Sequence, residues 1–237
     1  MSKGNSLIAL TAPPAFWTRN VITLDIAARR KKGTFSRTSG PEDRKSPRNR
    51  GCLNGFAFLR VPVNEQGQTS QPHIYAIGDI VPGPMLAHKA SREAKVAAES
   101  LAGQKSAFDN RAIPAVVYTD PEIAWTGLTE YEAKRSNRPY KVGRFPQRAL
   151  GRARTLGRTE GMVKIITDPE SNLILGVGMV GLHVSELIAE ATLALEMGAT
   201  LEDLMVTIHP HPTLSESLLE AAEVAAGAAV HLPPAKK

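Results

Sequence analysis

Residues 209–218 have the sequence HPHPTLSESL, and this run decides how the C-terminal part of the chain is interpreted. Each proline fixes its own φ angle and biases the preceding residue toward an extended conformation, so His211 is held between two stiff points. Thr213 and Glu216 have the spacing of a capping box, which predicts a helix that begins at Leu214. The same spacing lets the Glu216 carboxylate orient a neighbouring imidazole, as a general base requires.

Spacing alone leaves two interpretations of this run open. In the first, a histidine and Glu216 form an acid/base dyad. In the second, the run is a proline-rich turn before a capped helix, the histidines are surface residues and Glu216 only caps. Motifs of this length carry a high risk of false positives, so a second feature of the sequence has to decide.

That second feature is the run IYAIGD at residues 74–79, an apolar strand that ends in glycine and an acid. Folds of the α/β class present a carboxylate to a ligand hydroxyl in this way, so Asp79 is a candidate acceptor for a polyol. A turn-rich connector follows, and MLAHKA then opens a helix predicted from Met85 to Leu101, whose first turn offers free backbone N–H groups. The alternative is that Met85, Leu86 and Ala87 are ordinary core residues.

Together the two runs resemble the C-terminal half of dihydrolipoamide dehydrogenase, a flavin-dependent pyridine-nucleotide disulfide oxidoreductase. The resemblance covers about residues 61–231 and includes VPVNE at 61–65, YTDPE at 118–122, GLTE at 127–130 and GVGMVG at 176–181. Glutathione reductase and mercuric reductase share parts of this pattern. The string HxHPTxxE together with MLAHKA is most similar to the lipoamide enzyme, and the chain is identified as a member of that family.

The resemblance implies roles for eight residues. His211 would be the base that takes a proton from the dithiol, Glu216 would orient it, and His209 would support the pair. Asp79 would bind the ribityl or ribose part of FAD, and four residues would lie against the flavin: Met85, Leu86, Ala87 and His88. The resemblance also implies NAD as second cofactor, a homodimer in which the base serves the partner's flavin, and lipoyl domains of 2-oxo acid dehydrogenase complexes as partners.

Three features of that family are missing from the sequence. Cys52 is the one cysteine, whereas dithiol–disulfide exchange needs a thiolate with a resolving partner. Neither glycine-rich nucleotide fingerprint is recognised: Gly176 and Gly178 follow a predicted strand and Gly181 arrives three residues later, but no acid stands at the distance of a ribose contact. We interpret that segment as a glycine-bearing strand and helix start. The sequence therefore predicts part of an FAD site, no NAD site, and no lipoamide dehydrogenase activity from this chain alone.

Positive charge is concentrated near the N-terminus. Residues 1–50 hold 11 Lys and Arg against 3 Asp and Glu, a net charge of +8, whereas the remainder holds 18 against 20. Segment 28–50 combines this charge with Ser, Gly and Pro and shows no helical or strand period, so it is predicted to be disordered. A nucleic-acid arm or a transit peptide are alternatives, but no aromatic interleaving or sustained amphipathic helix accompanies the charge. A truncated or out-of-frame gene start is expected instead.

The overall composition, 42% hydrophobic and 22% charged, is ordinary for a globular protein. A single cysteine suits a reducing compartment, and no run of about twenty apolar residues predicts a membrane span. We predict the cytoplasm or the mitochondrial matrix as compartment, no nucleic-acid or membrane partner, and no metal site.

The predicted fold class is α+β. Residues 111–232 are expected to form an interface (dimerisation) domain, an antiparallel sheet with helices. A remnant of the FAD/central domain at 56–110 and a disordered basic N-terminus at 1–55 are expected before it, and 233–237 are expected to be a tail. Strands are predicted at 115–118, 122–125, 141–145, 162–167 and 173–180, the first two as a hairpin. Helices are predicted from Thr129, with Glu132 completing a capping box, and at 186–197, stopped by Gly198.

Two segments of this domain have competing interpretations. The broad apolar side of helix 186–197 either covers only its own sheet or also meets another subunit. The arginine-rich segment 144–154 is interpreted as a solvated loop rather than a nucleic-acid patch. The predicted function is a fragment of a dihydrolipoamide dehydrogenase, which reoxidises protein-bound dihydrolipoamide with NAD. The alternatives are a catalytically inert dimerisation module and a basic-tailed binding protein.

Overall fold

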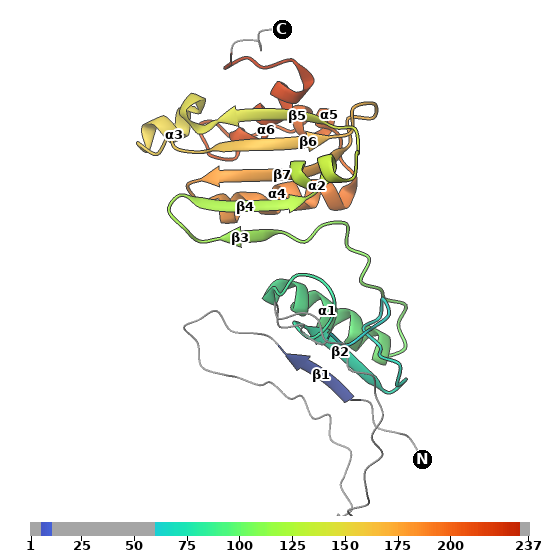
Figure 1. The fold of residues 1–237 in the computed structure, drawn as a ribbon. Helices are drawn as coiled ribbons and strands as arrows, with labels where there is room; N and C mark the ends of the chain where they lie inside the picture. Colours follow the sequence, from blue (N-terminus) through green and yellow to red (C-terminus); the bar gives the residue numbers. More distant parts are fainter. Residues whose placement is uncertain (1–5, 11–59, 233–237) are drawn as a thin grey trace, which may run out of the picture. The chain divides into compact units, whose positions relative to one another are not determined.

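The structure is a computed structural model that describes residues 6–10 and 60–232. The chain divides into two units, residues 1–109 and 110–237 (Figure 1). In the described part of the chain, no helix is both long and apolar enough to span a membrane.

The first unit contains two parallel strands and one helix. Strand β1 (Ser6–Leu10) pairs in parallel with β2 (Ile74–Gly78), and α1 (Ala87–Leu101) packs against β2. The strand β1 lies within the range for which the sequence predicts disorder. Its sequence, SLIAL, is apolar. It is therefore more typical of a strand than the charged segment that follows it in the chain. The rest of the disorder prediction for residues 1–55 falls outside the described residues.

Helix α1 begins two residues later than predicted. Leu86 is its N-cap, in an extended conformation, and the first helical bond runs from the Ala90 N–H to the Leu86 carbonyl at 3.1 Å. The Leu86 N–H is itself engaged in a turn, because it donates to the Pro84 carbonyl at 3.1 Å. Met85 and Leu86 therefore lie in the connector, and the first helical turn contains Ala87 and His88.

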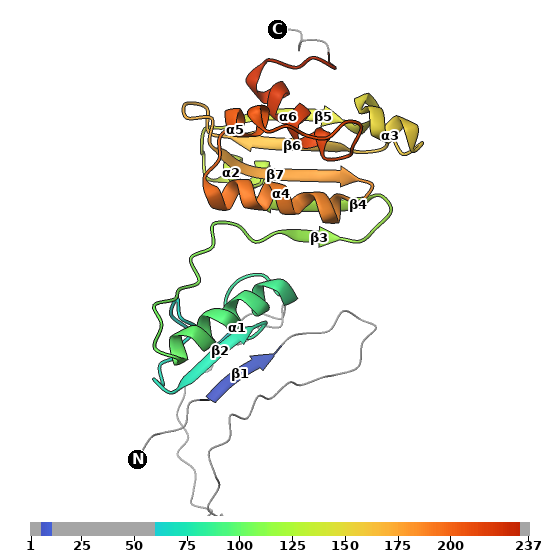
Figure 2. The same ribbon diagram turned by 180° about the vertical axis from the view of Figure 1, so that it is seen from behind.

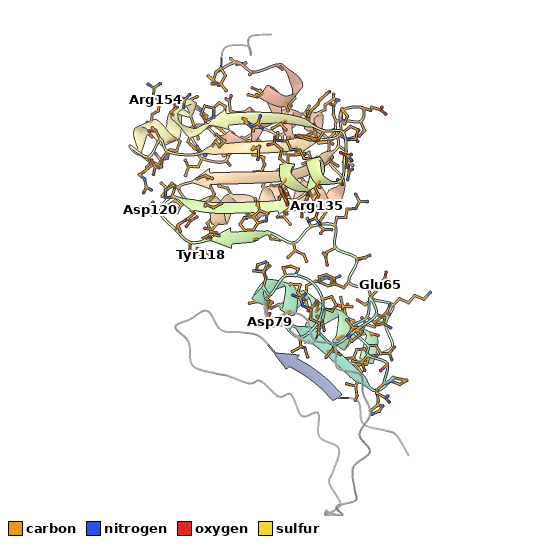
Figure 3. All side chains as sticks on the ribbon, viewed as in Figure 1. Glu65, Asp79, Tyr118, Asp120, Arg135 and Arg154 are labelled. Carbon is orange, nitrogen blue, oxygen red and sulfur yellow. The ribbon has the colours of Figure 1, made fainter. Side chains whose placement is uncertain are left out.

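The second unit is built on a five-stranded antiparallel sheet, as predicted. Its strands are β3 (Ala115–Val117), β4 (Glu122–Gly127), β5 (Lys141–Pro146), β6 (Met162–Thr167) and β7 (Ile174–Gly181), in the order β3-β4-β7-β6-β5. The predicted hairpin is β3–β4, with Tyr118 and Asp120 in its turn (Figure 3). The glycine-rich run 176–181 is confirmed as part of a strand, with Gly178 opposite Trp125 on one side and Lys164 on the other.

Two helices cover one face of this sheet. Helix α4 (Val184–Met197) packs on β4 and β7, and α6 (Glu216–Ala226) packs on β5 and β6, while α2 (Glu130–Arg135) lies on the opposite face (Figure 2). The core between sheet and helices includes Phe145, Val163 and Leu218, each 1% exposed or less. At Gly143 an added Cβ would collide with the backbone of α6, so glycine permits the close approach of helix and strand.

Local signals predicted the ends of two helices correctly. At α2 the Thr129 hydroxyl accepts from the Glu132 N–H at 3.2 Å, and the Glu132 carboxylate accepts from the Thr129 N–H at 2.9 Å. Helix α4 ends at Gly198, whose φ of +67° is the left-handed cap conformation. The short helix α5 (Leu201–Val206) was not predicted, although Thr200 and Asp203 form a reciprocal capping pair before it.

The interpretation of 144–154 as a solvated loop is wrong. After the end of β5 the segment forms a 3₁₀ turn, η1 (Gln147–Ala149), and the short helix α3 (Gly151–Thr155), with Arg154 visible on α3 (Figure 3). Leu150 and Ala153 are buried in the core of the unit, and these apolar anchors hold the segment against the sheet. Of the arginines in this segment, Arg144, Arg148 and Arg154 are exposed and Arg152 is half-buried.

Candidate functional site

The loop between α5 and α6 brings His211 and Glu216 into contact. The Nδ1 atom of His211 lies 2.8 Å from Glu216 Oε1. The His211 side chain is 76% exposed, whereas that of Glu216 is 17% exposed. Because a carboxylate oxygen accepts, His211 donates from Nδ1 and keeps the lone pair of Nε2 for another group. The structure thus forms the His-Glu contact that the sequence predicted.

The helix after this loop begins at Glu216 and not at Leu214. The Thr213 hydroxyl donates to the Pro210 carbonyl at 2.7 Å and lies 2.9 Å from the Ser215 hydroxyl, and Ser215 rather than Thr213 takes the N-cap position, without a side-chain cap. Only the other half of the predicted box is present, since the Thr213 N–H donates to Glu216 Oε2 at 2.7 Å. Glu216 therefore uses one oxygen to hold the loop and the other to hold the imidazole.

These contacts keep Glu216 ionised. Partial burial desolvates the carboxylate and acts to raise its pKa, but the Thr213 N–H and the His211 ring together outweigh burial and hold the pKa of Glu216 below its usual value. An ionised carboxylate on Nδ1–H stabilises the protonated imidazole and fixes its tautomer. The dyad can therefore accept a proton at Nε2.

His209 contacts a different helix. Its Nε2 atom lies 2.8 Å from Glu190 Oε1 on α4, and its Nδ1 atom lies 3.0 Å from the Thr207 carbonyl. The His209 side chain is 4% exposed, so it is buried where His211 is open. The prediction that His209 supports the dyad is not tested by these contacts, but they show how the loop is attached to α4.

The residues predicted to contact FAD lie in the first unit, around the end of β2. Asp79 directly follows Gly78, whose φ is +81°, and Figure 3 marks its position. Lys89 and Glu93 hold both peptide groups of Gly78: the Gly78 N–H donates to Glu93 Oε2 at 2.7 Å, and the Lys89 Nζ donates to the Gly78 carbonyl at 3.2 Å. The 2.7 Å ion pair between Lys89 and Glu93 is largely shielded from solvent. This clamp fixes the backbone that carries Asp79.

The other flavin candidates surround the start of α1. Met85 is 47% exposed and Leu86 is half-buried, while Ala87 and His88 are exposed in the first helical turn. The exposure of Met85 and Ala87 argues against the interpretation that they are core residues. Leu86 is half-buried, so its exposure favours neither the core nor the flavin interpretation. The structure places these residues and the His-Glu dyad in separate units.

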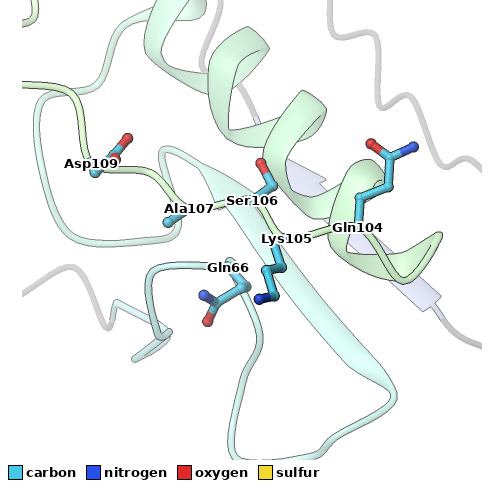
Figure 4. A pocket seen from close by; sticks show the side chains of 6 residues that line it. All are labelled: Gln66, Gln104, Lys105, Ser106, Ala107 and Asp109. Carbon is cyan, nitrogen blue, oxygen red and sulfur yellow. The ribbon is translucent and has the colours of Figure 1, made fainter.

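A hollow of about 410 Å³ opens elsewhere in the first unit (Figure 4). It contains none of the predicted flavin contacts. Its lining is mostly polar and comprises Gln66, Gln104, Lys105, Ser106, Ala107 and Asp109. Among residues 6–10 and 60–232, no three side chains of the metal-binding types come together in a way that could hold an ion.

The sequence interpretation missed three residues around the site. Lys89 and Glu93 are four residues apart on a helix, the spacing of a helical ion pair, and could have been found from that signal. Glu190 lies on α4, 19 residues before its partner His209 in the loop after α5. No local pattern links the two.

Two family models match the chain. Residues 113–222 match the dimerisation domain of the pyridine nucleotide-disulphide oxidoreductases, and residues 57–94 match the pyridine nucleotide-disulphide oxidoreductase model. Dihydrolipoyl dehydrogenase from Thermus scotoductus is 56% identical over 172 residues, which are 73% of this chain and 37% of that protein. The enzyme from Halobacterium salinarum is 53% identical, over 73% of this chain and 36% of its own length.

Solved structures that resemble this chain are also flavoprotein disulfide reductases or related enzymes. LpdA from Mycobacterium tuberculosis superimposes with a TM-score of 0.65 at 28% identity, over 73% of this chain and 37% of that structure. The flavoprotein disulfide reductase RclA from Escherichia coli has a TM-score of 0.62 at 26% identity, over 68% and 37% of the two chains. This chain thus spans little more than a third of the length of the relatives that it matches. The chain belongs to the pyridine nucleotide-disulphide oxidoreductase family, and its C-terminal unit is the dimerisation domain of that family.

Proposed function

We propose that the C-terminal unit supplies the acid/base dyad and the subunit interface of a dihydrolipoyl dehydrogenase-type enzyme. The observation that carries this proposal is the 2.8 Å contact between His211 Nδ1 and Glu216, which leaves Nε2 on an open surface. The curated relatives with 48–56% identity are dihydrolipoyl dehydrogenases, which supports a dithiol as the substrate class.

In the proposed mechanism, Nε2 of His211 takes the proton from a thiol of dihydrolipoamide, and the sulfur becomes a thiolate. The positive charge that forms on the ring is stabilised by the ionised Glu216 carboxylate, which accepts a hydrogen bond from Nδ1–H. Glu216 is kept in place by the Thr213 N–H, so the ring needs no reorientation when it accepts the proton. The family uses FAD and NAD, and FAD when bound would carry the electrons of the dithiol toward NAD.

For the first unit we propose part of the contacts to a flavin cofactor. The carboxylate of Asp79 follows a strand whose last peptide is clamped by Lys89 and Glu93, which suits a fixed contact to a ribityl or ribose hydroxyl. Met85, Leu86, Ala87 and His88 would lie against the ring system. The glycine-rich run 176–181 lies in a paired strand, so its backbone does not form a phosphate-binding loop.

For the interface we propose the outer side of α4. Leu193 and Met197 lie one turn apart and are 62% and 74% exposed, while the opposite side of α4 is buried on the sheet. Ile208, 95% exposed, is brought beside α4 by the contact between His209 and Glu190. Exposed apolar surface next to the dyad loop suits a second copy of the chain, because the base would then reach the partner's flavin.

The redox part of the reaction is not assigned to this chain. Its one cysteine cannot form the pair that a disulfide relay requires, so we propose that the chain acts as the C-terminal fragment of such an enzyme. The lack of an NAD site in this chain, the lipoyl-domain partners and the cytoplasmic or mitochondrial compartment remain predictions. On its own the chain is expected to form no NADH from dihydrolipoamide with added FAD, and a turnover of roughly 1 per second or more would contradict this.

A chimera tests the dyad directly. Residues 61–231 would replace the matching segment of the Thermus scotoductus enzyme, and NADH formation from dihydrolipoamide would be followed. His211→Gln is expected to lower kcat by about 10²–10⁴, the usual contribution of a positioned general base, and Glu216→Gln by a smaller factor. His231→Gln is the matched control, since His231 also pairs with a glutamate of α6, Glu220, but lies on the C-terminal segment.

The alternative function is an inert dimerisation module. A folded, dimeric chimera whose activity changes less than about tenfold in His211→Gln would favour this alternative and refute the dyad. A loss of the same size in His231→Gln would show that the histidine substitutions act through stability.

A further inference from the structure

The two histidines of the α5–α6 loop face different sets of acceptors. His211 has one acceptor, Glu216, at 2.8 Å. His209 has two, the Glu190 carboxylate at 2.8 Å and the Thr207 carbonyl at 3.0 Å. Both ring nitrogens of His209 are thus engaged within the protein, and His209 acts as an anchor for the loop.

We propose that Glu190 and His209 are positioning residues for His211. By attaching the loop to α4, they keep the Nδ1–H of His211 on Glu216 and its Nε2 free. This inference rests on the proposed function, in which His211 is the base. It adds a role for Glu190, which contacts His209 rather than His211.

Burial supports this division of roles. The His211 side chain is 76% exposed, so packing does not fix its ring, and one hydrogen bond and the path of the backbone determine its orientation. His209 lies two residues earlier, is 4% exposed, and bonds to a charged partner. Hydrogen bonds with an ionised partner are stronger than neutral ones, and their strength rises as water is excluded. The imidazole of His209 is buried in this contact, although the Glu190 side chain is 35% exposed, and the contact is therefore better able to hold the loop than the packing around His211.

The element that carries Glu190 is rigid. Val184, Ile188 and Ala191 of α4 are all 3% exposed or less and lie in the main core of the unit. A loop attached to such a helix keeps a defined position relative to α6, where Glu216 lies. Catalytic geometry is held best by side chains that are themselves fixed on packed elements.

The tautomer of His211 reports this positioning without any enzymatic activity. Long-range ¹H–¹⁵N NMR spectra of the full chain distinguish Nδ1–H from Nε2–H rings when His211 is neutral. The wild type is expected to show mainly the Nδ1–H form. In Glu190→Ala the ratio of Nδ1–H to Nε2–H is expected to fall about tenfold, the effect of losing one charge-assisted hydrogen bond. Glu186→Ala, an exposed glutamate of the same helix, is the control and is expected to leave the ratio unchanged.

Two further variants separate positioning from stability. Glu190→Gln keeps an acceptor oxygen at the same reach and should return the ratio toward the wild-type value. His209→Gln removes the contact from the loop side, in case the α4 variant does not fold. A ratio within about twofold of wild type in folded Glu190→Ala or His209→Gln, or an equal change in Glu186→Ala, would overturn the proposal. The measurement needs neither FAD nor dithiol, so a failure of the proposed function leaves it interpretable.

Discussion

Replacing Glu130 by glutamine should destabilise the C-terminal unit in a way that disappears in acid. The Glu130 carboxylate lies 2.8 Å from Arg144 Nη2, 3.2 Å from Lys134 Nζ and 3.3 Å from Lys164 Nζ. Desolvation acts to raise its pKa, but the three cations outweigh desolvation and lower the pKa of Glu130 from 4.5 to about 2. This cluster ties α2 to β5 and β6 across the open face of the sheet.

The expected magnitude follows from that change in pKa. Lowering a pKa from 4.5 to about 2 corresponds to at most about 3 kcal/mol of stabilisation at neutral pH. The side chains of Arg144 and Lys134 are 49% and 66% exposed, so solvent screening reduces the contribution. We expect Glu130→Gln to lower the free energy of unfolding by about 1–2 kcal/mol near neutral pH.

The sign of the pH dependence is fixed by linkage. Because the folded-state pKa lies below the unfolded value, the stabilisation is complete above about pH 4.5 and is lost as the pH falls toward about 2. Urea unfolding of wild type and Glu130→Gln, followed by circular dichroism, should show the difference at about pH 7 and little of it at about pH 2.5. Glu170→Gln, at an exposed turn position, is the control. A difference of equal size at both pH values would refute the electrostatic explanation.

Three further outcomes are expected. Leu193→Asp on the outer side of α4 should weaken the homodimer at least about tenfold in sedimentation experiments, whereas Leu156→Asp, at the end of α3, should not; a monodisperse wild-type monomer at micromolar concentration would defeat the interface proposal. Leu218, which is 1% exposed, faces its own core, so Leu218→Ala should lower the free energy of unfolding in urea by about 2–5 kcal/mol. FAD should bind the chain weakly in a fluorescence-quenching titration, and sub-micromolar, stoichiometric binding would show that another segment supplies a phosphate-binding loop.

The sequence predicted those parts of the fold whose signals are local. Local sequence predicted the five strands of the dimerisation domain, the first two as a hairpin. Gly198 predicted the end of α4, because glycine readily adopts the left-handed conformation of a helix cap. The capping box at Thr129 was predicted because both of its partners lie within one helical turn. In each case the residues that determine the structure are neighbours in the chain.

The errors arose where a distant partner or a competing acceptor decided the structure. The Thr213 hydroxyl contacts the Pro210 carbonyl and the Ser215 hydroxyl, Ser215 takes the N-cap position, and α6 begins at Glu216. Between β5 and β6, the arginines suggested a solvated loop, but Leu150 and Ala153 find the core and fold the segment into short helical turns. Neither outcome is visible from charge or spacing alone.

The site itself shows the same limit most clearly. In HPHPTLSESL each histidine is followed by proline, so the local sequence gives the two rings almost the same surroundings. The tertiary structure makes them different, because His209 pairs with Glu190 on α4 and His211 pairs with Glu216 on α6. One ring is buried between two acceptors, and the other keeps a free nitrogen on the surface. The different surroundings of the two rings are therefore determined by the helix that each one contacts.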